Sequence, residues 1–188
     1  LSLNNENSII GLSREAKKTQ DKINGERIKR TTELVGRIAV FILTPESQEL
    51  LDSGPKMRRQ YLDWGLFHVE PLFVEVSRRY RRVLMQRNAW LKSLTAKVPG
   101  VGEDPWMEQF QSMAVQISEL REDYVSQLTP YFRGNLRRLA PELEATIGYD
   151  WGGLISAAES EKKLGESWSR DVKFGATHRG PHRGDLVF

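Results

Sequence analysis

The sequence lacks cysteine altogether and contains no long hydrophobic run. Without cysteine there are no disulfides, no thiolate metal ligands and no cysteine nucleophile, and a reducing compartment fits. No apolar stretch approaches the roughly 20 residues that cross a bilayer. The first seven residues also lack the basic start and apolar stretch of a signal peptide. We therefore predict a cytoplasmic protein with no membrane contact.

Motifs of nucleotide and metal enzymes are also missing. No glycine begins a Gly-x-x-x-x-Gly-Lys-Ser/Thr string, whose backbone amides and lysine would hold phosphates. His178 and His182 lie near Asp185, but the neighbouring Arg179 and Arg183 would repel a metal cation. No set of nucleophile, base and orienting group can be assembled. We predict no metal site and no catalytic residue.

Positive charge is concentrated in one part of the chain. The net charge is only +3, yet residues 56–97 hold ten basic side chains against three acidic ones. A localised basic stretch is typical of a surface that contacts a phosphate backbone. A solvated helix face is the alternative, and charge alone leaves both open.

The first quarter of the sequence favours strands. Residues 8–12 and 37–43 are apolar runs of strand length, and the second is typical of a buried strand. Asn24 and Gly25 favour the positive φ angles of a type I′ turn, so we predict a hairpin there. Residues 47–51 predict a helical turn.

The middle of the chain predicts two long helices. Apolar residues alternate spacings of three and four in two rows, which is typical of a helix that packs against another helix. The first row is Phe73, Val76, Tyr80, Val83, Arg87, Trp90 and Leu94, and the second is Trp106, Phe110, Met113, Ile117, Leu120, Tyr124 and Leu128. A loop over residues 97–105 makes them an antiparallel helical hairpin. We expect Pro130 to kink or end the second helix, and residues 131–139 to resume it.

The last part predicts a return to strands. Residues 144–153 look extended, residues 155–169 have helical composition, and residues 172–188 alternate as a strand does. We predict an α+β fold in which the first and last strands share one sheet and a helical-hairpin arm interrupts it. The expected parts are residues 1–54, 55–143 and 144–188. Both ends of the sequence resemble strands in progress, from which we expect a fragment.

Three strings resemble motifs of the RecF family of bacterial DNA-repair ATPases. They are residues 54–71 (GPKMRRQYLDWGLFHVEP), residues 80–89 (YRRVLMQRNA) and residues 180–186 (GPHRGDL). Residues 41–46 (FILTPE) are similar to the strand and turn that precede the arm in that family. The order and spacing are kept over nearly the whole chain.

This resemblance implies part of an ABC-type ATPase head with a short helical arm. It also implies that the intact protein binds ATP and Mg, forms an ATP-dependent homodimer and binds DNA at single-strand gaps or single-strand/double-strand junctions. RecR and RecO are the implied protein partners, with which it helps load recombinase. The family's ATP motifs lie outside this sequence, so we expect this piece to bind no cofactor and to hydrolyse no ATP alone.

Four arginines are the candidates for DNA contact: Arg78, Arg79, Arg81 and Arg82. Each neutralised phosphate would steepen the salt dependence of binding. The alternatives are a solubilising role or pairing with Glu119, Glu122 and Asp123 of the second helix.

For other charged residues we expect mainly structural roles. We expect Arg58, Arg59 and Asp63 to form a network that fixes the arm to the head, in preference to direct DNA contact. Arg87 lies in the first apolar row, so it needs a carboxylate or carbonyl partner. Near the end of the chain, Arg179, His182 and Arg183 are candidates to approach a phosphate of nucleotide or DNA.

One alternative function remains open at this stage. A stand-alone helical hairpin that binds DNA or protein without nucleotide chemistry has the same two helices. An upstream phosphate-binding loop in the reading frame would distinguish the two.

Overall fold

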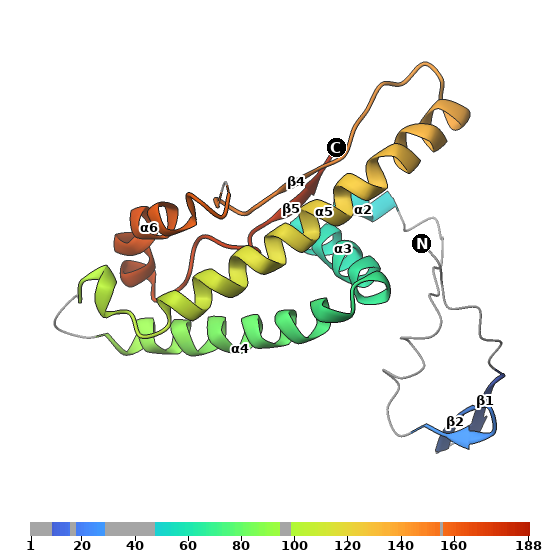
Figure 1. Cartoon of the computed structure of the whole chain (residues 1–188), viewed down its shortest axis with the longest axis horizontal. Coiled ribbons are helices and arrows are strands. Elements are labelled where there is room, and N and C mark those ends of the chain that lie inside the picture. Colours follow the sequence, from blue (N-terminus) through green and yellow to red (C-terminus); the bar gives the residue numbers. More distant parts are fainter. Residues whose placement is uncertain (1–8, 16–17, 29–47, 95–98, 155) are drawn as a thin grey trace.

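The computed structural model describes residues 9–15, 18–28, 48–94, 99–154 and 156–188, and helices dominate it (Figure 1). The elements are β1 (Ile10–Glu15), β2 (Lys18–Ile23), β3 (Glu26–Arg27), α2 (Glu49–Asp52), α3 (Pro55–Val69), α4 (Pro71–Ser93), η2 (Val101–Glu103), α5 (Met107–Leu139), β4 (Gly148–Asp150), α6 (Ser160–Phe174) and β5 (Asp185–Val187). The strand predicted over residues 37–43 lies outside the described residues. In the described part, no helix has the length and apolar character that crossing a membrane requires.

The predicted hairpin at Asn24 and Gly25 is confirmed. These residues have φ angles of 49° and 86°, as a type I′ turn requires. They join β2 to β3, which pair antiparallel with Ile23 opposite Glu26. β1 pairs antiparallel with β2 on its other side, which completes a three-stranded sheet.

Two prolines set where α3 and α4 begin. Pro55 and Pro71 stand in the first turn of their helices, where a missing N–H costs nothing. Glu70 lies between the helices: its N–H donates to Leu66 O at 2.9 Å, and its carboxylate accepts from Leu72 N at 3.2 Å. The chain therefore turns at one residue, and α3 and α4 both pack against α5.

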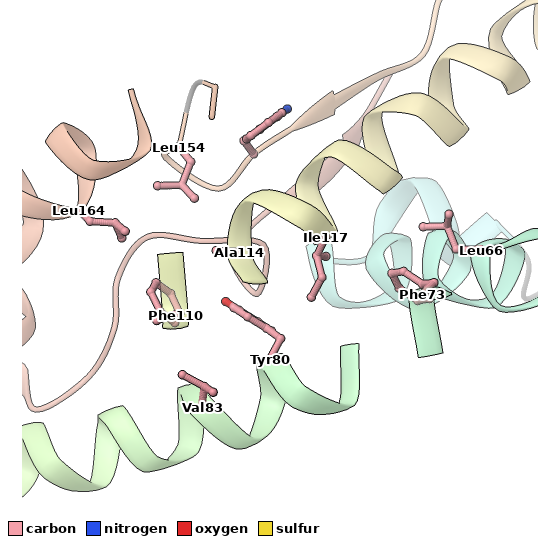
Figure 2. Close-up of a cluster of buried hydrophobic side chains, with 10 residues drawn as sticks. Leu66, Phe73, Tyr80, Val83, Phe110, Ala114, Ile117, Leu154 and Leu164 are labelled. Atoms are coloured by element: carbon pink, nitrogen blue, oxygen red, sulfur yellow. The ribbon is translucent and has the colours of Figure 1, made fainter. Parts of the chain in front are cut away.

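Helices α4 and α5 lie side by side and run in opposite directions, as the two apolar rows predict (Figure 1). Phe73, Tyr80 and Val83 of α4 are buried against Phe110 and Ile117 of α5. Nine of the buried side chains from α3 to α6 converge in Figure 2. The predicted hairpin is confirmed, although the contact also includes the small residues Ser77, Ala114 and Ser118.

Pro130 does not end the second helix, contrary to one of the two expectations. α5 continues through it to Leu139. Both Pro130 and Ser126 are exposed, so water can reach the Ser126 carbonyl that loses its helical partner. Thr129 Oγ1 also donates to Val125 O at 2.8 Å in the turn before the proline.

The helix in the final part has the predicted length but lies further along the chain than the sequence predicts. α6 begins at Ser160 and ends at Phe174, five residues later at each end than residues 155–169. Gly175 ends it in the left-handed region with a φ of 60°, where glycine has no Cβ to clash. Among the described residues that follow α6, the only strand is β5. The residues just before β5 form a turn, in which Arg183 N–H donates to Gly180 O at 2.8 Å.

The prediction that the first and last strands share one sheet is wrong for the described residues. β1, β2 and β3 form one sheet, and β4 and β5 form a second, antiparallel sheet with Tyr149 opposite Leu186. The physical reason is that each strand of the first sheet finds its partner across a short connection. Local pairing closes smaller loops and costs less chain entropy than pairing across the helices.

Glycines allow two close approaches in the folded part. A Cβ on Gly65 of α3 would lie 2.1 Å from the Tyr124 hydroxyl of α5. Gly152 has a φ of 69°, and a Cβ there would lie 2.2 Å from Gly180 O and 2.5 Å from Gly184 N. The turn after β4 therefore packs backbone against backbone on the residues that precede β5.

We predict that Gly152→Ala destabilises the chain, whereas Gly165→Ala stabilises it. Gly152 needs a positive φ and has no room for a methyl group, so we expect a loss of about 2 kcal/mol or more in the free energy of unfolding. Gly165 is exposed within α6 and a Cβ would meet nothing within 4 Å. Alanine there should add up to about 1 kcal/mol. Urea unfolding measures both, and equal effects of the two substitutions would contradict the packing at Gly152.

Candidate nucleic-acid interface

The residues between α6 and the chain end, 175–187, form a return segment that the helices hold in place. Its centre of attachment is Arg87 of α4, whose side chain is fully buried. The guanidinium donates to Asp104 Oδ2 at 2.7 Å, to Asp171 Oδ2 at 2.9 Å and to Thr177 Oγ1 at 2.6 Å. Two carboxylates thus compensate the buried charge, as the position of Arg87 in the apolar row requires. The Phe110 ring lies 5.2 Å from the guanidinium carbon.

Two further side chains of α4 bind the return segment. Asn88 Oδ1 accepts from the backbone N–H of Thr177 at 2.8 Å and from its hydroxyl at 2.7 Å. Tyr80 places its hydroxyl 2.6 Å from His182 Nδ1, while His182 Nε2 lies 3.0 Å from Thr177 O. Since a carbonyl only accepts, Nε2 carries the proton and Nδ1 accepts from Tyr80.

Burial decides the protonation of this pair. It lowers the pKa of His182 to about 4, helped by the nearby charges of Arg183 and Arg59. Burial also raises the pKa of the Tyr80 hydroxyl far above its usual value. At neutral pH His182 is therefore an uncharged ring that faces inward.

Arg121 of α5 is a second buried attachment point, which the sequence-based prediction missed. It donates to Asp63 Oδ1 from Nε at 3.0 Å and from Nη2 at 2.7 Å. Its Nη1 donates to Tyr149 Oη at 3.0 Å and to Pro181 O at 2.7 Å. One signal was present: Arg121 follows the buried Ile117 by four residues, so it lies on the helix face that packs inward.

The pair Arg58 and Arg59 attaches the start of α3 to β5. Arg58 forms a two-bond ion pair with Asp185, with both N–O distances at 2.9 Å. Its third nitrogen donates to three carbonyls around the end of α2: Leu50, Leu51 and Ser53. Arg59 donates to Gly184 O at 2.8 Å. Asp63 belongs to a different group, since it pairs with Arg121 on α5.

The four arginines predicted for DNA contact lie on the opposite, exposed side of α4. Arg79 forms an ion pair with Glu75 of its own helix. Arg81 lies 3.9 Å from Asp63 Oδ2 with 73% of its side chain exposed, which is a weak and screened contact. Among the residues that the structure describes, Arg78 and Arg82 have no carboxylate within ion-pair distance.

Pairing with the second helix was the alternative to DNA contact. Within the described ranges, none of Glu119, Glu122 and Asp123 forms an ion pair with these arginines. The acidic side chains of α5 therefore leave Arg78 and Arg82 available for another anion.

Near the chain end the predicted arginines differ in their partners. Arg179 donates to Lys163 O at 2.9 Å and pairs with Glu166 at 3.0 Å, whereas Arg183 is exposed. His178 N–H and ring both approach Asp171 Oδ1, at 2.9 and 3.1 Å. In the part of the chain that the structure describes, no three acidic or histidine side chains are grouped as metal ligands.

Comparison with known proteins shows which proteins this chain is similar to. No family model matches the chain. It is 36% identical over 181 residues to the DNA replication and repair protein RecF of Hydrogenovibrio crunogenus, which covers 95% of this chain and 49% of that protein. It is 35% identical over 187 residues to RecF of Shewanella baltica, which covers 99% of this chain and 51% of that protein. The chain thus spans about half the length of the curated relatives it matches.

The fold is also that of solved RecF structures. A structure described as the recombination mediator protein RecF-ATP in the RecFOR pathway superposes with a TM-score of 0.74 at 25% identity, over 94% of this chain and 50% of that one. A second RecF structure gives 0.73 at 24% identity. The chain therefore has an α+β fold that matches half of these RecF structures. In sequence and in fold, the chain is thus similar to about half of a RecF protein.

We predict that His182 makes the stability of the chain fall with acid. Its folded pKa is about 4, below the unfolded value of about 6.5. The unfolded state therefore binds more protons as pH falls, and stability present above pH ~6.5 is lost toward pH ~4. Between pH ~7.5 and ~4.5 we expect His182 to account for about 2–3 kcal/mol.

Urea unfolding across this range measures the effect. His182→Gln should lose less stability over the interval than the natural chain, by about that amount. Tyr80→Phe is the control, since it keeps the ring buried and should retain most of the pH dependence. A His182→Gln variant with the full acid loss would refute the assignment.

Proposed function

We propose that this chain supplies the DNA-contacting helical arm of a RecF protein. Such a protein is ATP-dependent, binds DNA, and acts in recombinational repair and replication restart. The observation that carries the proposal is the pair of exposed guanidinium groups of Arg78 and Arg82 on α4, which have no partner among the residues that the structure describes. The similarity to RecF proteins suggests DNA as the partner, and the two arginines suggest which surface contacts it.

The geometry suits contact with a phosphate backbone. Arg78 and Arg82 are one helical turn apart, so they lie on the same face of α4 and reach neighbouring phosphates. Their helix is held rigidly from its other side by Arg87 and Tyr80, which limits the entropy lost on binding. Contacts of this kind fix position on DNA and carry no sequence information.

Further features of the intact protein follow from the family. We propose that it works in the cytoplasm with RecR and RecO at single-strand gaps, as an ATP-dependent homodimer that helps load recombinase. ATP and Mg would be held by motifs that this sequence does not contain, since it has no phosphate-binding loop. No step of hydrolysis is therefore assigned to its residues.

The stand-alone adaptor is the weaker candidate. The likeness to RecF runs over 99% of this chain in one relative, and it includes the return segment as well as the two helices. An adaptor that consists of the hairpin alone has no use for the buried bonds that attach α4 and α5 to α6 and to the return segment.

We predict that the double variant Arg78→Gln/Arg82→Gln weakens DNA binding on the order of tenfold near ~0.1 M salt. Each lost phosphate contact should also lower the slope of log affinity against log salt by about 1. Fluorescence anisotropy with a gapped duplex, over a series of salt concentrations, measures both quantities.

The matched control is Glu75→Gln/Arg79→Gln, which removes an existing ion pair from the same helix and leaves the net charge unchanged. It should bind DNA as the natural chain does, with the same salt slope. If the Arg78→Gln/Arg82→Gln variant also kept the natural affinity and slope, α4 would not be the DNA-contacting surface.

A further inference from the structure

A second basic site lies away from the exposed arginines of α4, in a cleft between α6 and the turn that follows β4. We call it the α6 cleft. Its volume is about 610 Å3, and its lining includes Gly152, Gly153, Arg170, Arg179 and Arg183. This volume falls in the range of small-ligand sites.

Glycine backbone forms one wall of the cleft. Gly152 and Gly153 have φ angles of 69° and 83°, which leaves peptide groups rather than side chains on that wall. A Cβ on Gly153 would lie 3.1 Å from Arg179 Cγ, so the arginine stem packs directly on the turn. The missing Cβ positions are filled by the backbone of Gly180 and Gly184 and by the Arg179 side chain, so this wall is tightly packed and the anion-binding groups of the cleft are its arginine side chains.

The carboxylates of the cleft are already engaged. Asp150 Oδ1 accepts from Gly152 N–H at 2.8 Å. Glu166 pairs with Arg179 at 3.0 Å and with Lys163 at 3.3 Å, and these two cations lower the pKa of Glu166. The charge of Arg179 is therefore largely neutralised by Glu166.

Two cations remain. Arg170 and Arg183 line the same cleft and, in the described part of the chain, neither has an ion-pair or hydrogen-bond partner on its side chain. They come from different elements, α6 and the turn before β5. A pair of unpaired guanidinium groups across one cleft raises the local positive potential and favours an anion between them.

Both arginines stand on fixed backbone. Arg170 precedes Asp171, which is fully buried and is held by Arg87 and by His178 N–H. The N–H of Arg183 donates to Gly180 O at 2.8 Å in a turn that packs on Gly152. Rigid support of this kind reduces the conformational entropy that binding would remove.

We propose that the α6 cleft binds a phosphate group between Arg170 and Arg183. Guanidinium groups match the geometry of phosphate oxygens through paired N–H donors. The site is independent of Arg78 and Arg82, so it does not rest on the proposed function of α4. Its ligand is a phosphate of a nucleic-acid backbone or of a free phosphate compound, which share this chemistry.

The test is titration with inorganic pyrophosphate, followed by calorimetry and by the NMR signals of the arginine Nε–H groups. We expect pyrophosphate to shift the Arg170 and Arg183 signals. Arg170→Gln/Arg183→Gln should lower its affinity about tenfold or more. The matched control Lys162→Gln/Lys173→Gln removes the same charge from exposed positions of α6 that do not line the cleft, and should keep the affinity.

Two results would overturn the site: no binding of pyrophosphate at millimolar concentration, or equal weakening by both double variants. A short single-stranded oligonucleotide distinguishes the sources. If it displaces pyrophosphate, the ligand is nucleic acid, and if it does not, the ligand is a free phosphate compound. An Arg78→Gln/Arg82→Gln variant should bind pyrophosphate normally, so failure of the α4 surface and failure of the cleft give different results.

Discussion

Arginines that bind the return segment to the helices are the constraint on which the rest of this structure depends. The buried Arg87 and Arg121 and the partly buried Arg58 each join a helix to a residue of that segment. A buried ion pair adds little net stability over apolar packing, because desolvation offsets most of the attraction. Its partners are nevertheless costly to separate. The arginines therefore specify which segment lies against which helix.

The three strings that resemble RecF motifs contain many of the residues that form this attachment. Arg58 and Arg59 of residues 54–71 and Tyr80 of residues 80–89 all bind residues 180–186, at Asp185, Gly184 and His182. Arg87, the other anchor in residues 80–89, instead binds Asp104, Asp171 and Thr177. Helix α4 contributes to two surfaces, because 3.6 residues per turn place its side chains on both sides of the helix. Its inner face holds the return segment, and its outer face presents the arginines of the proposed DNA contact.

The sequence predicted the features that interactions between neighbouring residues determine. The apolar rows predicted α4 and α5, and Asn24 and Gly25 predicted the hairpin. The position of Arg87 in the first row predicted its need for a carboxylate or carbonyl partner. Contacts between distant residues were not accessible in the same way. Arg121 was missed because only apolar residues were counted in the second row, and the pairing of β4 with β5 depends on a turn that packs on Gly152. The inward orientation of His182 depends on Tyr80, about a hundred residues earlier.

Native-state hydrogen exchange tests the fastening of the return segment most directly. The N–H of Thr177 donates to Asn88 Oδ1 at 2.8 Å, and that of Gly180 donates to Gly152 O at 3.0 Å. If the buried arginines hold the segment, both amides should exchange with free energies within about 1 kcal/mol of those of Val83 and Ile117. If Thr177 and Gly180 exchanged with a much lower opening free energy than the amides of α4 and α5, that result would contradict the account.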